Sequence, residues 1–158
     1  MLRAGVIGLG DMGSGLAKNL IKNGIATTGL DLSDERMSAF VEMSGTPAGS
    51  VAELGTNSDA VFVMVMNGVQ AKAVILGDDG LAAHMPKGGA VILTATIKPS
   101  EARDIGAALE GSGIHLIDSP VSGGFPGAQG GTLTMMAAAT SEVLDQYKPI
   151  MSAVSKTI

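Results

Sequence analysis

The chain has 158 residues, of which 46% are hydrophobic and 16% charged, and this composition fits one soluble domain with a well-developed core. A formal net charge of −5 and the scatter of the ten Lys and Arg residues argue against nucleic acid or a membrane surface as the main partner. Without cysteine, and with only two isolated histidines, the chain is expected to bind no metal. It begins with a strand pattern and not with a signal peptide, so we expect a cytoplasmic protein that binds a small molecule.

Hydrophobic segments rich in Val and Ile alternate along the chain with segments of helical periodicity. This alternation predicts a doubly wound α/β fold with a mostly parallel sheet. The predicted strands are residues 3–7, 25–30, 60–66, 90–93, 114–117 and 132–138. The predicted helices are residues 12–23, a helix from about residue 33, and residues 69–76, 99–110 and 142–153. No repeat or linker divides the sequence, so residues 1–158 are predicted to form one domain.

A G-x-G-x-x-G run follows the first predicted strand and opens the first predicted helix. Its residues are Gly8, Leu9, Gly10, Asp11, Met12 and Gly13. In such a run the first glycine permits a tight turn, the second lets the backbone approach a pyrophosphate, and the third lets the helix pack on the strand. The first N–H groups of the helix then point at the anion. An ordinary glycine-rich turn is the alternative, but the position between strand and helix predicts a dinucleotide site in a Rossmann-type domain.

The second predicted strand leads into Asp31, 18 residues beyond Gly13, where a carboxylate can bind a ribose 2′-hydroxyl. This residue favours NAD over NADP, because it would face the 2′-phosphate of NADP. Two unit charges about 4 Å apart repel by about 4 kcal/mol at an effective dielectric constant of about 20, which is about a thousandfold in affinity. NADP is the less favoured alternative. Arg36 is in reach of a 2′-phosphate, but it belongs to the next helix and is expected to face solvent.

FAD-binding proteins and methyltransferases share the glycines and the acidic residue, so the rest of the chain has to narrow the chemistry. Over essentially its whole length the chain resembles the β-hydroxyacid dehydrogenases, relatives of 3-hydroxyisobutyrate dehydrogenase and of the NAD domain of 6-phosphogluconate dehydrogenase. The motifs that carry the resemblance are residues 5–13 (GVIGLGDMG), 16–20 (LAKNL), 64–67 (MVMN), 96–99 (TIKP) and 118–134 (DSPVSGGFPGAQGGTLT). Residues 27–32 (TTGLDL) and 65–71 (VMNGVQA) look most like the L-threonate dehydrogenase branch.

The resemblance implies a cofactor site built from several loops. It comprises Gly8, Leu9, Gly10, Asp11, Met12, Gly13, Asp31 and Leu32, with Val65, Met66, Asn67 and Thr96 on the ribose and nicotinamide side. The last four residues fall at the carboxyl ends of strands, at the sheet edge where open α/β sheets bind ligands. Packing at a strand end is the alternative for these four. For Val65 and Met66 any binding is expected from the backbone.

The resemblance also implies that Ser122, Gly123 and Gly124 bind the substrate carboxylate. A hydroxyl and successive N–H groups in a glycine-rich turn form a concave anion site that a ligand can approach closely. A plain connecting loop is the alternative. Asp118, just before this loop, is expected to shape it by hydrogen bonds to nearby N–H groups.

The catalytic base of the family is a Lys on a helix of a second, helical domain. No residue of this chain matches it, so we expect that Lys beyond Ile158, the helical domain absent from this chain, and NAD binding without turnover. Lys98, His84 and His115 are assigned no role in catalysis. Apolar surface is expected on the last helix and around the Ser-Gly-Gly loop, where the second domain would pack.

These observations predict the cofactor-binding domain of an NAD-dependent oxidoreductase. Its substrate would be a small hydroxy acid of the 3-hydroxyisobutyrate or L-threonate type, and the full-length parent is expected to be a homo-oligomer. The alternatives are a non-catalytic NAD-binding or scaffold module and an imine-reductase-like NADP enzyme domain. The latter would not need the Ser-Gly-Gly loop for a carboxylate.

Overall fold

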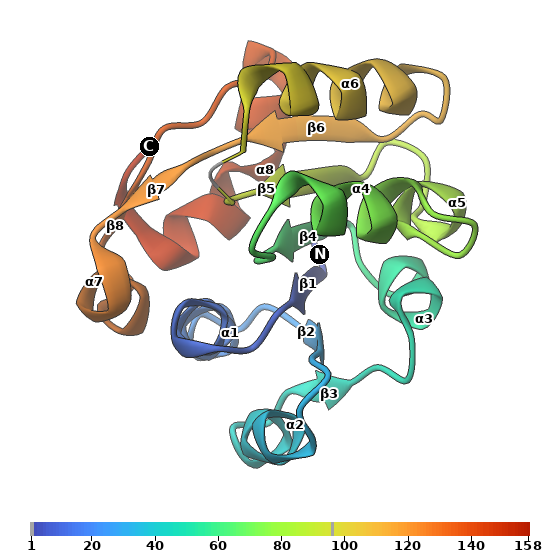
Figure 1. Ribbon diagram of the computed structural model, residues 1–158. Helices are drawn as coiled ribbons and strands as arrows, with labels where there is room; N and C mark the ends of the chain where they lie inside the picture. Colours follow the sequence, from blue (N-terminus) through green and yellow to red (C-terminus); the bar gives the residue numbers. More distant parts are fainter. Residues whose placement is uncertain (1, 96) are drawn as a thin grey trace.

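The computed structural model describes residues 2–95 and 97–158 and is built around a six-stranded sheet in which every neighbouring pair of strands is parallel (Figure 1). The strands are β1 (Ala4–Ile7), β2 (Thr27–Leu30), β3 (Thr46–Pro47), β4 (Ala60–Val63), β5 (Ala90–Leu93) and β6 (His115–Asp118). Their order in space is β3-β2-β1-β4-β5-β6. The order reverses between β1 and β4, and a crevice at the carboxyl ends of the strands is expected at such a point. The predicted doubly wound fold is confirmed.

Helices cover both faces of this sheet. The helices are α1 (Asp11–Lys22), α2 (Asp34–Glu42), α3 (Val51–Thr56), α4 (Gly68–Leu76), α5 (Leu81–His84), α6 (Pro99–Glu110), α7 (Gly124–Gly130) and α8 (Ser141–Val154). One core is formed by α1, α2 and α8, and the other by α3, α4, α5 and α6. Alternate strand residues supply the two cores: Phe62 of β4 faces the first, and its neighbours Val61 and Val63 face the second.

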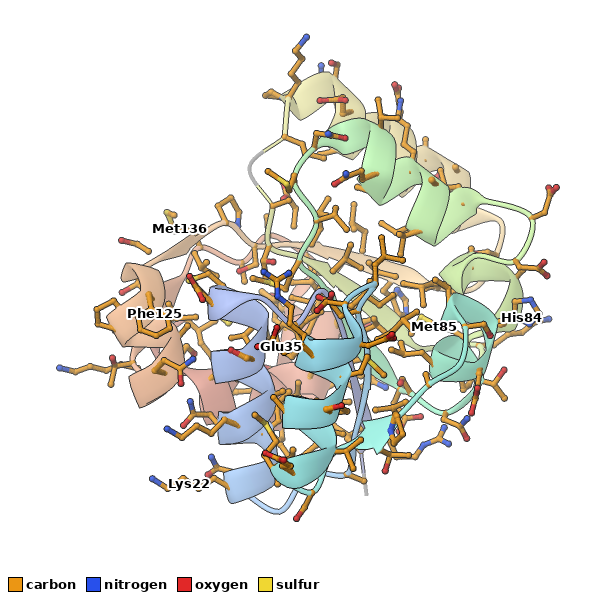
Figure 2. All side chains as sticks on the ribbon, turned by 60° about the horizontal axis from the view of Figure 1, so that its bottom comes forward. Lys22, Glu35, His84, Met85, Phe125 and Met136 are labelled. Atoms are coloured by element: carbon orange, nitrogen blue, oxygen red, sulfur yellow. The ribbon has the colours of Figure 1, made fainter. Side chains whose placement is uncertain are left out.

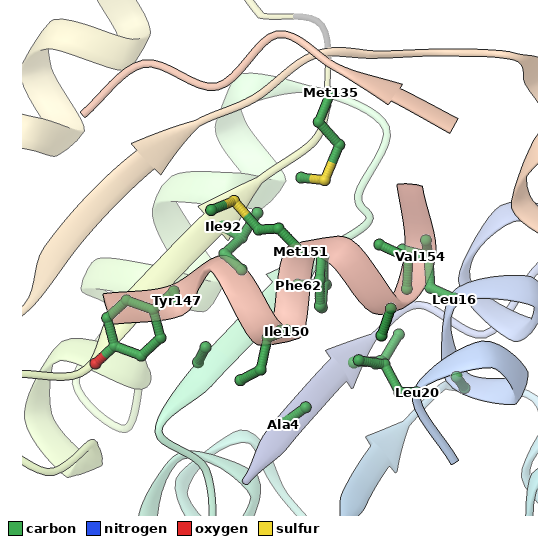
Figure 3. Packing of buried hydrophobic residues seen from close by; sticks show 14 of the residues in the cluster. Ala4, Leu16, Leu20, Phe62, Ile92, Met135, Tyr147, Ile150, Met151 and Val154 are labelled. Carbon is green, nitrogen blue, oxygen red and sulfur yellow. The ribbon is translucent and has the colours of Figure 1, made fainter. Parts of the chain in front are cut away.

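The last helix, α8, packs its apolar face onto the sheet (Figure 3). Ile150 and Met151 are fully buried in the same core as Phe62 and Ile92 of the central strands. The ring of Tyr147 is also buried, and its hydroxyl donates a hydrogen bond of 2.5 Å to the carbonyl oxygen of Gly88. The expected exposure of an apolar face on this helix is therefore wrong, because the sheet itself covers that face.

A second, smaller sheet lies beside the carboxyl end of β6. It contains β7 (Val121–Ser122), β8 (Leu133–Met135) and β9 (Ser155–Thr157), with β8 in the middle, antiparallel to β7 and parallel to β9. Helix α7 connects β7 to β8 and lies against α1 (Figure 1). This arrangement brings residues 124–130 close to the first helix.

The predicted elements differ from the structure mainly where elements are short. The strand predicted at residues 60–66 ends at Val63, and the chain then leaves the sheet. The strand predicted at residues 132–138 is limited to Leu133–Met135 and belongs to the smaller sheet. Elements β3, α3, α5, α7, β7 and β9 were not predicted, because segments of two to seven residues are too short to show a period. Among the described residues, no helix is long and apolar enough to cross a membrane.

At the amino ends of the strands, Asp59 links β1 to β4. Its carboxylate accepts hydrogen bonds from the backbone N–H of Arg3 at 2.8 Å and from the Arg3 guanidinium at 3.1 and 3.2 Å. Burial by itself would raise the pKa of Asp59, but the hydrogen bonds from Arg3 outweigh it and hold that pKa below its ordinary value. The charged form of Asp59 therefore stabilises the fold.

We predict that this contribution disappears in acid. Because the pKa of Asp59 is lower in the folded than in the unfolded chain, its stabilisation is complete above the unfolded pKa and is lost as the pH falls through the folded pKa, below about pH 4. Asp59→Asn should lower the free energy of unfolding at neutral pH by about 1 kcal/mol and make its acid decline shallower, as measured by urea unfolding. Asp104→Asn, at an exposed ion pair with Lys72, is the control, and an equal effect there would contradict the assignment.

Candidate functional site

A groove of about 740 Å³ lies at the carboxyl ends of β1, β2, β4 and β5. Most of the predicted cofactor residues line it, namely Gly8, Gly10, Asp11, Met12, Gly13, Asp31, Leu32, Val65 and Met66. Thr94, Ala95 and Gln70 are further lining residues that the sequence did not single out. The groove is thus formed by four loops that are distant in sequence and adjacent at one edge of the sheet.

The glycine loop has the backbone geometry that its sequence predicts. Gly8 has a φ of 95°, and a Cβ there would lie 2.5 Å from the carbonyl oxygen of Met64. A Cβ on Gly13 would overlap the carbonyl oxygen of Gly8, so only glycine lets α1 approach β1 this closely. Gly10 differs, because a Cβ there would have the Arg36 guanidinium as its nearest neighbour, at an ordinary contact distance of 3.7 Å, and would fit. The empty space beside Gly10 is where a ligand can approach the backbone.

The start of α1 supplies N–H groups beside this space. Gly10 is the N-cap, and its carbonyl oxygen accepts the first helical hydrogen bond, from Ser14 at 2.8 Å. The N–H groups of the three residues between them have no acceptor within the helix, as in the first turn of any α-helix. With the positive end of the helix dipole they suit an anion such as a pyrophosphate.

Asp31 joins the end of β2 to the glycine loop. One carboxylate oxygen accepts a hydrogen bond of 2.7 Å from the N–H of Leu9, and the other accepts one of 2.9 Å from the N–H of Ser33. The Asp31 side chain is only 9% exposed. The Leu9 side chain is buried in the core, so the part of Leu9 that serves the site is its amide. These two bonds hold the carboxylate at the rim of the groove.

Arg36 is exposed, as expected, but it also lines the groove and is paired with Asp31. Its Nη1 atom is 3.7 Å from a carboxylate oxygen of Asp31, and its guanidinium lies beside Gly10. Helical side chains point back toward the helix N-terminus, and from the first turn of α2 this direction leads to Asp31. The side chain remains 56% exposed, so it is paired and still able to move.

The loop after β4 forms another wall of the groove. The Met66 N–H donates to the Gln70 side chain at 2.8 Å, and the Asn67 side chain accepts from the Gln70 N–H at 2.9 Å. Val65 and Met66 line the groove, whereas the Asn67 carboxamide caps α4. Thr94 ties this loop to β5 through a hydrogen bond of 3.1 Å from its hydroxyl to the Val63 carbonyl oxygen. Thr96, also predicted for the site, lies outside the described residues.

The predicted carboxylate loop contains Ser122, Gly123 and Gly124, all exposed. Gly123 and Gly124 have φ angles of 127° and 57°, a backbone that residues with a Cβ rarely adopt. The loop is therefore open to a ligand, although it lies beyond the residues that line the groove. The expected apolar surface around it is present: Phe125 and Met136 are 52% and 55% exposed and lie on the same side of the molecule (Figure 2).

Asn19, which the sequence did not single out, attaches the carboxylate loop to α1. Its buried side-chain NH₂ group lies 2.9 Å from the carbonyl oxygens of Gly15 and Ala128 and 3.0 Å from that of Gln129. A Cβ on Gly15 would lie 2.6 Å from the backbone of Ala128, so α7 packs directly on α1. Asn19 thereby connects α1, which begins at the glycine loop, with α7, which begins at Gly124.

Asp118 does not have the role expected from the sequence. Its described hydrogen bonds are made by the backbone, which is bridged to Ala138 at 2.8 and 3.2 Å in both directions. Burial raises the pKa of the Asp118 carboxyl group. The start of the carboxylate loop is thus held by backbone pairing, which a sequence pattern does not reveal.

No catalytic role was predicted for the two histidines or for Lys98. The structure places all three at the ends of helices or strands. His84 ends α5, 3.4 Å from Asp79, and Figure 2 shows it at the opposite end of the molecule from Phe125. His115 begins β6, at the amino ends of the strands. Lys98 precedes α6, and its N–H is bonded to the Glu101 side chain.

The parallel sheet, the glycine loop after β1 and the carboxylate after β2 together define a Rossmann-type dinucleotide-binding domain. Residues 3–158 match the family described as the NAD binding domain of 6-phosphogluconate dehydrogenase, and the chain belongs to this family.

The chain is similar in sequence and structure to several hydroxy-acid dehydrogenases. It is 38% identical to L-threonate dehydrogenase of Cupriavidus necator over 151 residues, which are 96% of this chain and 51% of the relative. It is 35% identical over 158 residues to the NAD-dependent L-serine dehydrogenase of Pseudomonas aeruginosa, covering 100% of this chain and 53% of the relative. The structure of 3-hydroxyisobutyrate dehydrogenase from Salmonella typhimurium superposes with a TM-score of 0.94 at 32% identity, covering 99% of this chain and 55% of that one. The chain thus spans about half the length of the relatives it matches.

We predict that alanine at Gly13 will mainly reduce stability, whereas alanine at Gly10 will mainly weaken dinucleotide binding. Gly13→Ala should lower the free energy of unfolding by about 3 kcal/mol, because its Cβ meets backbone that cannot yield. Gly10→Ala should change that free energy by less than about 1 kcal/mol but weaken dinucleotide binding at least about tenfold. Urea unfolding and calorimetric titration separate the two effects. Equal stability of both variants would contradict the packing role of Gly13.

We also predict that Asn19 specifically holds α7. Asn19→Ala removes the donor to Ala128 and Gln129 and should cost about 1–3 kcal/mol of stability. Hydrogen exchange should become faster in residues 124–130 while residues 99–110 keep their protection. Asn23→Ala, which removes one side-chain bond at the end of α1, is the control and should leave α7 protected. A uniform rise in exchange across the whole chain would instead indicate general destabilisation.

Proposed function

We propose that this chain is the cofactor-binding part of an NAD-dependent dehydrogenase that oxidises the hydroxyl group of a small hydroxy acid. The observation that carries the proposal is the groove at the carboxyl ends of the strands, with the open backbone of Gly10 on one side and the held carboxylate of Asp31 on the other. The names of the relatives support an L-threonate, L-serine or 3-hydroxyisobutyrate type of substrate. They favour this function over a scaffold or an imine reductase.

The residues of the groove fit NAD. The first-turn N–H groups of α1 and the uncrowded Gly10 suit a pyrophosphate, whose oxygens need donors and close approach. The Asp31 carboxylate is fixed by Leu9 and Ser33 and has lone pairs left to accept a hydrogen bond from a ribose hydroxyl. When bound, NAD accepts the hydride from the alcohol carbon of the substrate.

The carboxylate of the hydroxy acid is assigned to Ser122, Gly123 and Gly124. Gly123 and Gly124 have positive φ angles, in a glycine-rich turn whose successive N–H groups suit an anion, and Ser122 adds a hydroxyl donor. Asn19 and the close packing of α7 on α1 keep this loop in place relative to the glycine loop. Proton removal from the substrate hydroxyl is assigned to a Lys in the part of the relatives that this chain does not cover, so the chain alone should bind without turning over.

Calorimetric titration with NAD tests the cofactor assignment. The chain should bind NAD, and Asp31→Asn should bind it about tenfold more weakly, because a neutral acceptor forms a weaker hydrogen bond than a carboxylate. Asp34→Asn is the matched control: it makes the same change of charge on an exposed residue of α2 and should not alter binding. Failure of the unaltered chain to bind NAD would reject the proposed function.

The same samples test the carboxylate loop. With NAD present, L-threonate or L-serine should shift the NMR amide signals of residues 122–124, and glycerol, which lacks a carboxylate, should not. Equal shifts with glycerol would count against this loop as the carboxylate site.

A further inference from the structure

Asp31 and Arg36 form an ion pair at the rim of the groove. An inference about this pair rests on the dinucleotide binding proposed above. We propose that the pair determines the choice of cofactor, with Arg36 binding the 2′-phosphate of NADP, so that the groove accepts NADP as well as NAD. The proposal concerns residues of this chain alone and can be tested by binding.

The charge of Asp31 is compensated by its neighbours. A large preference for NAD requires an isolated carboxylate facing the 2′-phosphate. Here both carboxylate oxygens accept backbone hydrogen bonds, from Leu9 and Ser33, and the Arg36 cation lies 3.7 Å from one of them. A neighbouring cation cancels most of the field of an anion beyond a few ångströms. The repulsion of a 2′-phosphate by this pair is therefore much smaller than that by a lone Asp31.

The Arg36 guanidinium is available to a phosphate. At 3.7 Å the contact with Asp31 is longer than a hydrogen bond, so the guanidinium keeps N–H donors for another acceptor. The side chain is 56% exposed and flexible enough to turn on α2. The planar guanidinium binds phosphate through two parallel N–H groups, a geometry that lysine cannot provide.

The distribution of charge along the groove also favours Arg36 as the phosphate-binding group. Among the described residues that line the groove, the charged side chains are those of Asp11, Asp31 and Arg36, and Arg36 is the only cation. It also lines a second hollow on the other side of the glycine loop, together with Asp11 and Glu35. Asp11 and Glu35 are exposed, so solvent and salt screen them more than the pair at the rim. Among the described residues that line the groove, Arg36 is thus the one side-chain cation that can bind a 2′-phosphate near Asp31.

The test is the ratio of the dissociation constants for NADP and NAD, measured by calorimetric titration. We expect a ratio below about ten for the unaltered chain, in place of the thousandfold of an isolated charge. Arg36→Gln should raise the ratio to about one hundred by weakening NADP. Arg36→Lys should give an intermediate value, and Asp31→Asn should shift the ratio toward NADP.

Arg103→Gln is the matched control, since it removes the same charge from an exposed position on α6 and should leave the ratio unchanged. Titration with 2′-AMP and 5′-AMP locates the effect, because Arg36→Gln should weaken 2′-AMP and leave 5′-AMP nearly unchanged. Thermal unfolding confirms that each variant is folded.

Each contrary outcome has its own meaning. If the unaltered chain binds NAD and its ratio is already near a thousand, the inference is wrong and the proposed function stands. The same holds if Arg36→Gln weakens NAD and NADP equally, since Arg36 would then serve the pyrophosphate. If the unaltered chain binds neither dinucleotide, the inference and the proposed function both fail.

Discussion

The position of α1 depends on the close approach of Gly13 to Gly8, since a Cβ on Gly13 would overlap the carbonyl oxygen of Gly8. Because neither residue has a side chain, the first turn of the helix rests directly on the turn that follows β1. The N–H groups in the first turn of α1, which have no acceptor within the helix, therefore face the groove. This groove lies where the strand order reverses, between β1 and β4. A helix displaced outward by one methyl group would move both the anion site and the surface against which α7 packs.

Close approach is repeated on the other side of α1. Gly15 admits the backbone of Ala128, and Asn19 bonds to carbonyl oxygens of α7. A buried carboxamide is costly unless its donors are satisfied, and here the acceptors come from another helix, so the contact selects one position of α7. One helix thus positions the loop suited to a pyrophosphate and the loop suited to a carboxylate. A reaction between two ligands needs this relation to be constant.

The charges at the rim show how context changes the meaning of a residue. An Asp after the second strand ordinarily signals NAD, because an isolated anion repels a 2′-phosphate. In this structure the carboxylate also fastens the glycine loop through the Leu9 amide, and it is paired with Arg36. A residue can therefore serve the fold and the ligand at once, and its partners determine how strongly it discriminates.

The sequence by itself was sufficient for the doubly wound fold, the glycine loop and the carboxylate at the end of β2. These features depend on residues close together in the chain: a strand, a turn and a helix occupy residues 4–22, and their period and glycines are visible locally. The glycine-rich turn at positions 123 and 124 was visible for the same reason, since a turn is a local structure, and the structure adds that both glycines have positive φ angles.

Only the tertiary structure decided which distant groups meet. Periodicity showed that α8 has an apolar face, but not that the sheet covers it. It predicted that Arg36 faces solvent, but not that its side chain also pairs with Asp31. The side-chain hydrogen bonds from Asn19 to Ala128 and Gln129 join residues 109 and 110 positions apart in the sequence. Strand β8 pairs with β7 and β9 and so belongs to the smaller sheet and not to the main one. A local pattern shows that a side chain will be buried or solvated, whereas its partner is chosen by packing between segments that the pattern does not connect.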